Sequence, residues 1–129
     1  MQGLHLTADL RGCDVALPLM RDPTALRAHC LVAVEQAGLL AVGNLFHRFP
    51  PRGPQDGAAV LGGGVTGVVL LAESHLAVHT WPEIGGVTLD VYVCNLQNDH
   101  AAQAEALMAQ LASAFAPQGA THQRLLRGV

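Results

Sequence analysis

The sequence predicts an α+β fold, a two-layer α/β sandwich in which an antiparallel sheet carries two helices on one face. The chain has 129 residues, which is the length of a single domain spanning residues 1–129. Half of the residues are hydrophobic and 13% are charged, so there is enough apolar material for a core and intrinsic disorder is excluded. Strand-like and helix-like segments alternate in the order β-α-β-β-β-β-α-β.

The first part of the chain predicts a strand, a helix and a second strand. Residues 5–10 alternate between apolar and polar, which is typical of a strand. Asp22 followed by Pro23 is a typical helix start, and the helix that follows is expected to end at Gly38. Residues 39–46 form an apolar run of strand length.

The middle of the chain predicts a long loop and then a meander. Residues 50–64 are rich in proline and glycine, which indicates a surface loop long enough for a lid or an insertion. Residues 65–71, 76–81 and 87–94 are β-rich runs separated by short joints. Short joints favour antiparallel pairing of these three strands.

A second helix and a last strand complete the sandwich. Asn98 or Asp99 is expected to cap the helix, and a short strand is expected near residues 121–126. The helix carries one apolar stripe, formed by Ala104, Leu107, Met108, Leu111 and Phe115. Two helices cover only one side of the sheet, and the strands between residues 65 and 94 carry apolar residues on both faces. We therefore expect a homodimer formed through the sheet.

Composition excludes several kinds of partner. The formal net charge of −3 lacks the basic excess that nucleic-acid binding requires. No apolar run approaches the length of a membrane span, and the N-terminal residues lack the pattern of a signal peptide, so we expect no membrane association and a cytoplasmic location. Cys13, Cys30 and Cys94 form no CxxC motif, which fits free thiols in a reducing compartment.

The chain contains no lysine, because all seven basic residues are arginines. Without lysine it cannot anchor pyridoxal phosphate, use a lysine Schiff base or build a P-loop. Several large enzyme classes are thereby excluded.

Reactive side chains are densest in the run ESHLAVHTWPE, residues 73–83, and in Cys94 on the next strand. Ser74 lies in no GxSxG motif, which argues against a serine hydrolase. His75, His79 and Cys94 are an alternative zinc site, although no fourth ligand lies nearby in the sequence. A third interpretation, that these groups are structural polar residues at a strand end, does not explain why five of them cluster.

Two runs, AESHLAVHTWPE (72–83) and LDVYVCN (89–95), resemble the signature of the prokaryotic S-adenosylmethionine decarboxylases. Further matches are HLTADLRGC (5–13), FHRF (46–49) and GVTG (64–67), which follow in the family's order and cover most of the chain. Members of this family are pyruvoyl-dependent lyases of spermidine and polyamine synthesis, and the resemblance implies the same activity here.

The resemblance also implies an autocatalytic cleavage of a zymogen. The Ser74 hydroxyl would attack the carbonyl of Glu73, and the chain would separate into residues 1–73 and residues 74–129. Ser74 would become the covalent pyruvoyl cofactor, which binds the substrate as a Schiff base. This expectation agrees with the missing lysine, because an amino-acid decarboxylase without pyridoxal phosphate needs another electrophilic carbonyl.

The family's processing roles fall on His79 and Thr66, and its proton donor falls on Cys94. A straight strand covers roughly 16 Å in five residues, so His79 cannot reach Ser74 of its own chain unless the segment bends sharply. If residues 65–71 and 76–81 form a hairpin turning near Ala72 and Glu73, Thr66 and His79 lie opposite each other. We therefore expect two sites in each homodimer, both shared between protomers.

The resemblance implies a substrate site as well. It places Glu83 on the ribose hydroxyls of S-adenosylmethionine, because a carboxylate accepts two hydrogen bonds. Phe49 and Trp81 are expected to stack on adenine or near the sulfonium. Leu76 is assigned to substrate binding through its backbone, with a side chain that packs in the core. No metal is expected in the site.

This chain departs from the family's pattern near the expected site. Thr66 replaces the usual serine, Ala72 replaces a common serine, and Asn95 replaces a common glycine. Residues 50–63 are longer than the family's link. Two alternatives stay open: a pyruvoyl-dependent ornithine or arginine decarboxylase, for which Glu83 would bind the distal cation, and an unprocessed regulatory paralogue.

Overall fold

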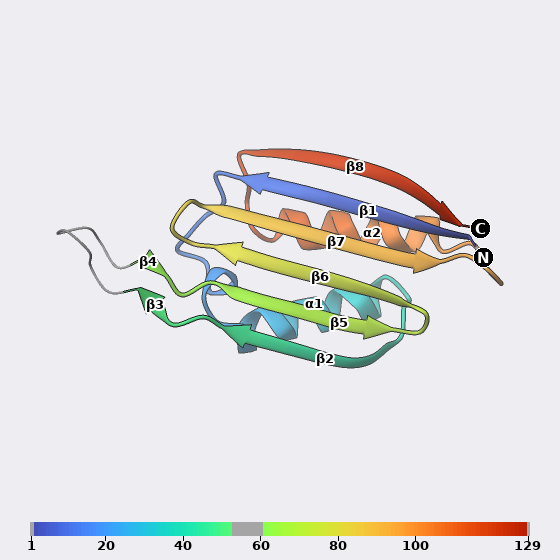
Figure 1. The fold of residues 1–129 in the computed structure, drawn as a ribbon, viewed down its shortest axis with the longest axis horizontal. Coiled ribbons are helices and arrows are strands. Elements are labelled where there is room, and N and C mark those ends of the chain that lie inside the picture. The colour runs from blue at the N-terminus through green and yellow to red at the C-terminus, as the bar shows by residue number, and fades with distance from the viewer. Residues whose placement is uncertain (1, 53–60, 129) are drawn as a thin grey trace.

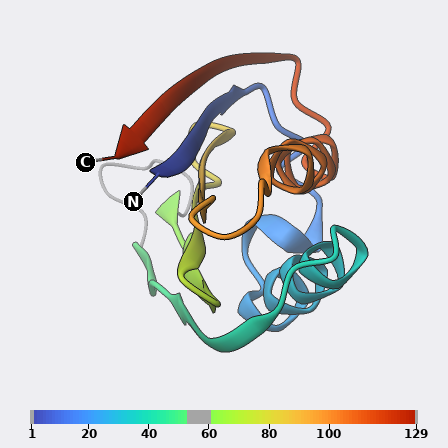
Figure 2. The same ribbon diagram turned by 90° about the vertical axis from the view of Figure 1, so that its right-hand side faces the viewer.

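The computed structural model describes residues 2–52 and 61–128 and shows a sheet with both helices on one face (Figures 1 and 2). Six strands form this sheet in the order β2-β5-β6-β7-β1-β8, and every neighbouring pair is antiparallel. The elements are β1 (Gln2–Arg11), the 3-10 helix η1 (Pro18–Met20), α1 (Pro23–Gln36), β2 (Ala41–Arg48), β3 (Pro51–Arg52), β4 (Leu61–Gly62), β5 (Val65–Leu71), β6 (Ser74–Trp81), β7 (Gly86–Cys94), α2 (Ala101–Ser113) and β8 (Gly119–Gly128).

The predicted two-layer architecture and the order of its main elements are confirmed, while several boundaries differ. β1 and β8 are longer than predicted because they pair with each other over ten residues. The paired two-residue strands β3 and β4 lie where only a loop was expected. Residues 53–60, the centre of the expected lid or insertion, lie outside the described residues.

Helix α1 begins and ends where the sequence predicts. Asp22 is the N-cap, and its side chain accepts a hydrogen bond from the backbone N–H of Thr24 at 2.9 Å. Pro23 needs no hydrogen-bond partner at the first helical position, because it has no N–H. Gly38 follows the helix with φ +78°, a backbone conformation that glycine adopts at little cost.

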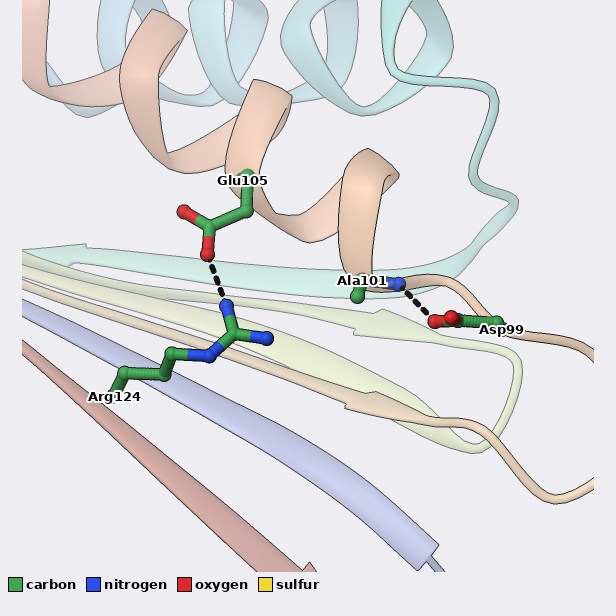
Figure 3. Close-up of polar contacts among 4 residues, drawn as sticks. All are labelled: Asp99, Ala101, Glu105 and Arg124. Carbon is green, nitrogen blue, oxygen red and sulfur yellow. Dashed lines mark hydrogen bonds and ion pairs between the residues drawn. The ribbon is translucent and has the colours of Figure 1, made fainter.

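The predicted cap of α2 was wrong by one residue. His100 is the N-cap residue, and its side chain makes no capping bond. The Asp99 carboxylate instead accepts a hydrogen bond from the N–H of Ala101 at 2.9 Å (Figure 3). The same figure shows the ion pair between Glu105 and Arg124, which joins α2 to the edge strand β8. Asp99 thus caps the first turn from outside the helix.

The core lies between the sheet and the helices. The predicted apolar stripe is buried there, with Leu107 and Phe115 at 0% exposure. The helix is shorter than predicted, because α2 ends at Ser113 and Phe115 follows it. The helix-facing residues of β6 alternate along the strand and are Leu76, Val78 and Thr80. This alternation places the intervening residues of β6 on the opposite, open face of the sheet.

The open face is more polar than the sequence interpretation allowed. On β5, β6 and β7 it carries Thr66, Val68, Leu70, His75, Ala77, His79, Trp81, Thr88, Asp90 and Tyr92. Apolar, polar and ionisable residues are therefore interleaved, so this face carries apolar residues as expected but is less uniformly apolar than the helix-facing side. The sequence did not show this difference, because nearly unbroken β-rich runs hide which residues fall on each face until the register is known.

The buried hydroxyl of Thr80 is expected to stabilise the fold. This buried residue accepts a hydrogen bond from the N–H of Val65 at 2.8 Å and donates one to the carbonyl of Met20 at 2.8 Å. Thr80→Val keeps the shape but leaves both backbone groups unpaired. We expect the free energy of unfolding to fall by about 2–5 kcal/mol. Urea denaturation measures it, with Thr80→Ser as the control that keeps the hydroxyl; equal losses in the two variants would contradict this account.

Candidate active site

The β5–β6 hairpin is the frame of the site. Its register runs from Leu71 opposite Ser74 to Thr66 opposite His79, as the sequence predicts. The Thr66 hydroxyl and the Nδ1 atom of His79 are 2.9 Å apart, within hydrogen-bond distance. The two residues with expected processing roles are therefore in direct contact.

The turn of this hairpin contains the expected cleavage site. Ala72 and Glu73 form the loop between the two strands. Glu73 has φ 55°, in the left-handed region that residues with a Cβ rarely adopt. This conformation costs about 1–2 kcal/mol relative to ordinary backbone. The residue on the N-terminal side of the expected scissile bond is therefore strained.

Ser74 and Cys94 meet at the same end of the hairpin. The Oγ atom of Ser74 accepts a hydrogen bond from the backbone N–H of Cys94 at 3.1 Å. Cys94 is partly exposed, whereas Cys13 and Cys30 are buried. Burial raises the pKa of the Cys30 thiol to about 12, which suits the packing role expected for it. Cys94 is thus the accessible thiol of the three.

A pocket of about 330 Å³ lies at the opposite end of the hairpin. It is lined by Phe49, Pro50, Gly63, Gly64, Thr66, His79, Thr80, Trp81 and Glu83. Three of the four residues expected to bind substrate are among them, together with both expected processing residues. The sequence interpretation had included Gly64 in the GVTG match without giving it a role. A Cβ atom at this position would lie 2.1 Å from the carbonyl oxygen of Thr80. Glycine is therefore required for the chain to pass so close to β6.

The pocket combines aromatic rings with an unsatisfied carboxylate. The rings of His79 and Trp81 stack with centroids 5.8 Å apart. The backbone N–H of Phe49 donates to the carbonyl of Gly64 at 2.9 Å, which holds this aromatic residue at the pocket. The Oε2 atom of Glu83 is buried and has no hydrogen-bond partner among the described residues. Because a buried unpaired carboxylate oxygen is costly, Glu83 is suited to accept hydrogen bonds from a ligand.

Leu76 is not part of this pocket. Its side chain is fully buried in the core and faces the helices. The expectation that the side chain packs in the core is met, and any contact of Leu76 with a substrate would have to use its backbone.

The structure separates the expected site residues into two groups. Glu73, Ser74 and Cys94 lie at one end of the hairpin, and the residues around His79 lie at the other. β6 pairs without a register shift from Ser74 onwards, so five residues of strand place the two groups roughly 16 Å apart. A single chain therefore does not bring His79 to Ser74, as the strand geometry predicts.

A family model described as S-adenosylmethionine decarboxylase matches residues 4–128. The chain belongs to the S-adenosylmethionine decarboxylase family. The family's S-adenosylmethionine decarboxylase proenzyme from Archaeoglobus fulgidus is 33% identical over 126 residues, which cover 98% of this chain and 97% of that protein. The proenzyme of the same name from Symbiobacterium thermophilum is 38% identical over 109 residues, 84% of this chain and 73% of that protein.

A solved structure from the S-adenosylmethionine decarboxylase family shares the fold. It is the crystal structure of the adenosylmethionine decarboxylase from Aquifex aeolicus, which matches with a TM-score of 0.79 and 32% identity. The match covers 98% of this chain and 91% of that one. The resemblance drawn from the sequence motifs is confirmed.

The loop between β7 and α2 makes contacts with Cys94 and Asn95 that the sequence did not predict. The Nδ1 atom of His100 lies 3.1 Å from the carbonyl oxygen of Cys94. The backbone N–H of His100 donates to the Oδ1 atom of Asn95 at 2.8 Å. The available signal was Asn95, which stands where a glycine is common in the family.

A row of aromatic and ionisable side chains on the open face was also missed. His75 and Tyr92 lie opposite each other on β6 and β7, with ring centroids 5.5 Å apart. His5 follows on β1 and lies 3.0 Å from a carboxylate oxygen of Asp90. Burial and, secondarily, the neighbouring charge of His5 lower the pKa of His75. Both effects favour the neutral form of the His75 imidazole.

The alternative zinc site finds no support in the geometry. Among residues 2–52 and 61–128, no three histidine, cysteine, aspartate or glutamate side chains are grouped so that they could hold a metal ion. In the same part of the chain, no helix is long and apolar enough to cross a membrane.

Proposed function

We propose that this chain is a pyruvoyl-dependent S-adenosylmethionine decarboxylase that cleaves itself between Glu73 and Ser74. The observation that carries the proposal is the grouping of a strained Glu73, the Ser74 hydroxyl and Cys94 at one hairpin end. Family membership and relatives named as proenzymes support it. The residues at this end fit a cofactor made from Ser74.

Self-cleavage begins when the Oγ atom of Ser74 attacks the carbonyl carbon of Glu73. The peptide C–N bond breaks, the nitrogen takes the proton, and the two segments are joined by an ester. Loss of the Cα proton of residue 74 then expels the carboxylate of Glu73 and leaves a dehydroalanine. Its imine tautomer reacts with water, which gives the carbonyl and releases ammonia. The N–H of Cys94 donates to the attacking oxygen and holds it beside the turn, and opening the loop relieves the strained φ of Glu73.

The resulting carbonyl supplies the electron sink that decarboxylation of an amino acid requires. Cys94 is suited to the protonation step that follows decarboxylation. A thiol is a weak acid that can give its proton to the substrate carbon after carbon dioxide has left. Cys94 lies at the end of β7 beside Ser74, so the proton donor and the cofactor-forming residue are neighbours.

The pocket favours a nucleoside substrate. Phe49 and the stacked pair of His79 and Trp81 offer aromatic surface to an adenine ring and to a sulfonium cation. The unpaired Oε2 atom of Glu83 can accept hydrogen bonds from ribose hydroxyls. Parallel assays with S-adenosylmethionine, ornithine and arginine test this assignment, and release of carbon dioxide from ornithine or arginine alone would contradict it.

A second copy of the chain would bring the two groups together. Two open sheet faces that pack about a twofold axis would bring the His79 end of one hairpin to the Ser74 end of the other. The open face offers exposed apolar residues for such a contact, including Leu45 on β2, Leu70 on β5 and Trp81 on β6. Each homodimer would then hold two shared sites.

Mixed dimers test the shared site. We expect Ser74→Ala and His79→Ala each to remain uncleaved when produced alone. When the two variants are produced together, a mixed dimer has one site with an intact Ser74 and an intact His79. The His79→Ala chain should therefore be cleaved in the mixture, which intact-mass analysis detects. If neither chain is cleaved in mixed dimers whose formation is verified with two affinity tags, the shared site is wrong.

A further inference from the structure

We infer that His100 is a positioning residue for Cys94, and that Asn95 holds His100 in place. This inference rests on the proposed function, because it assigns to the loop between β7 and α2 the task of fixing the proton donor beside Ser74. Neither residue touches the reacting atoms. Both act through the backbone of Cys94.

The hydrogen bond of His100 has a defined direction. Its Nδ1 atom lies 3.1 Å from the carbonyl oxygen of Cys94. A carbonyl oxygen can only accept, so the proton of this bond belongs to the imidazole. His100 is therefore the donor of this bond, and the carbonyl of Cys94 is the acceptor.

Asn95 closes the loop around that bond. Its Oδ1 atom accepts from the N–H of His100 at 2.8 Å, and its own N–H donates to the carbonyl of Gln2 on β1 at 2.8 Å. The residue after Cys94 is thereby tied both to the sheet and to the start of α2. A glycine at position 95 could make the bond to Gln2 but has no side chain to hold His100.

Helix α2 makes the arrangement rigid. His100 is the N-cap residue of α2, and the N–H of Ala104 donates to its carbonyl at 2.9 Å. Ala104 and Leu107 are fully buried, so the first turns of the helix are fixed against the sheet. The backbone of His100 is therefore held by the core, and its imidazole is positioned by the bond to Cys94.

The consequence for Cys94 is that both of its backbone polar groups are engaged. The carbonyl is held by His100, and the N–H points to the Oγ atom of Ser74 at 3.1 Å. Loss of the bond to His100 would free the last residue of β7 to move relative to Ser74. Self-cleavage should then become slower, and the thiol of Cys94 should become more exposed.

The first arm of the test follows self-cleavage of freshly translated protein by intact mass. We expect His100→Ala to slow cleavage by about three- to tenfold, the loss that one hydrogen bond accounts for. His100→Gln keeps an N–H donor and should restore most of the rate. His122→Ala, an exposed histidine of β8, is the matched control and should cleave as the unmodified chain does. Asn95→Gly should also slow cleavage, because it removes the side chain that holds His100.

The second arm measures alkylation of Cys94 by iodoacetamide in the uncleaved Ser74→Ala background. Cys13 and Cys30 are buried, so the fast-reacting thiol is Cys94. We expect His100→Ala to raise the alkylation rate by about three- to tenfold and His100→Gln to restore it. This arm needs no cofactor, so it tests the role of His100 even if the chain never cleaves. Failure to cleave would count against the proposed function and not against the role of His100. An unchanged alkylation rate in His100→Ala, or equal effects of Ala and Gln, would overturn the role of His100.

Discussion

Ser74→Ala is expected to yield a single uncleaved chain of 129 residues without decarboxylase activity. The reason is chemical, because alanine has no hydroxyl to attack the carbonyl of Glu73 and no oxygen from which a carbonyl cofactor could form. The backbone of the hairpin should be unaffected, since among the described residues the side chain of Ser74 has one hydrogen bond, accepted from the N–H of Cys94. The intact mass and release of carbon dioxide from S-adenosylmethionine measure the two effects.

Ser113→Ala is the matched control for this prediction. Ser113 is an exposed serine at the end of α2 whose hydroxyl donates to the carbonyl of Gln110 in the same helix. It should cleave and turn over as the unmodified chain does. Normal turnover by Ser74→Ala would defeat the proposed mechanism, because no other residue is assigned the formation of the cofactor.

Cys94→Ala should separate the two halves of the reaction. Its backbone N–H is retained, so the hydrogen bond to Ser74 and self-cleavage should persist. Carbon dioxide should still be released, but protonation of the substrate carbon should be slowed by about 10²–10⁴-fold or misdirected, the range typical of a missing general acid. The measurement compares the carbon dioxide released with the decarboxylated product formed.

A second variant tests the acidity of the Cys94 thiol separately from its size. Cys94→Ser keeps the size of the side chain but offers a much weaker acid than the thiol of Cys94. It should show the same mismatch between carbon dioxide and product as Cys94→Ala. Unchanged kinetics with matching amounts of carbon dioxide and product in Cys94→Ala would remove the role assigned to the thiol.

The sequence predicts best those features that depend on neighbours along the chain. Asp22 and Pro23 define the start of α1 because a cap and a proline act within one turn. The hairpin register follows from its two-residue loop, so the pairing of Thr66 with His79 could be deduced by counting from the turn. These local rules need no knowledge of the rest of the fold.

Features that depend on distant contacts could not be predicted in the same way. The length of β8 is set by its pairing with β1, and nearly all of its residues are exposed, so it lacks the apolar pattern that marks a buried strand. The polarity of the open face depends on which residues of β5, β6 and β7 share that face. That assignment changes completely with a shift of one residue in register.

The candidate site shows the same division. The motif around Ser74 and the pocket residue Glu83 were found because residue type and spacing carry the family's chemistry. His100 was missed because its contact with Cys94 is made through a backbone carbonyl, which leaves no signature in the sequence. Asn95 could have pointed to it, since a side chain that replaces a common glycine next to the proton donor acquires a hydrogen-bond partner in the folded chain.

The most direct test of the central claim is the intact mass of the purified, denatured protein. Self-cleavage at Ser74 predicts two fragments, residues 1–73 and residues 74–129, the second with a blocked N-terminus and a mass lowered by the loss of ammonia. A single chain of 129 residues that stays whole on incubation would contradict the account, because the proposed decarboxylase would then have no cofactor.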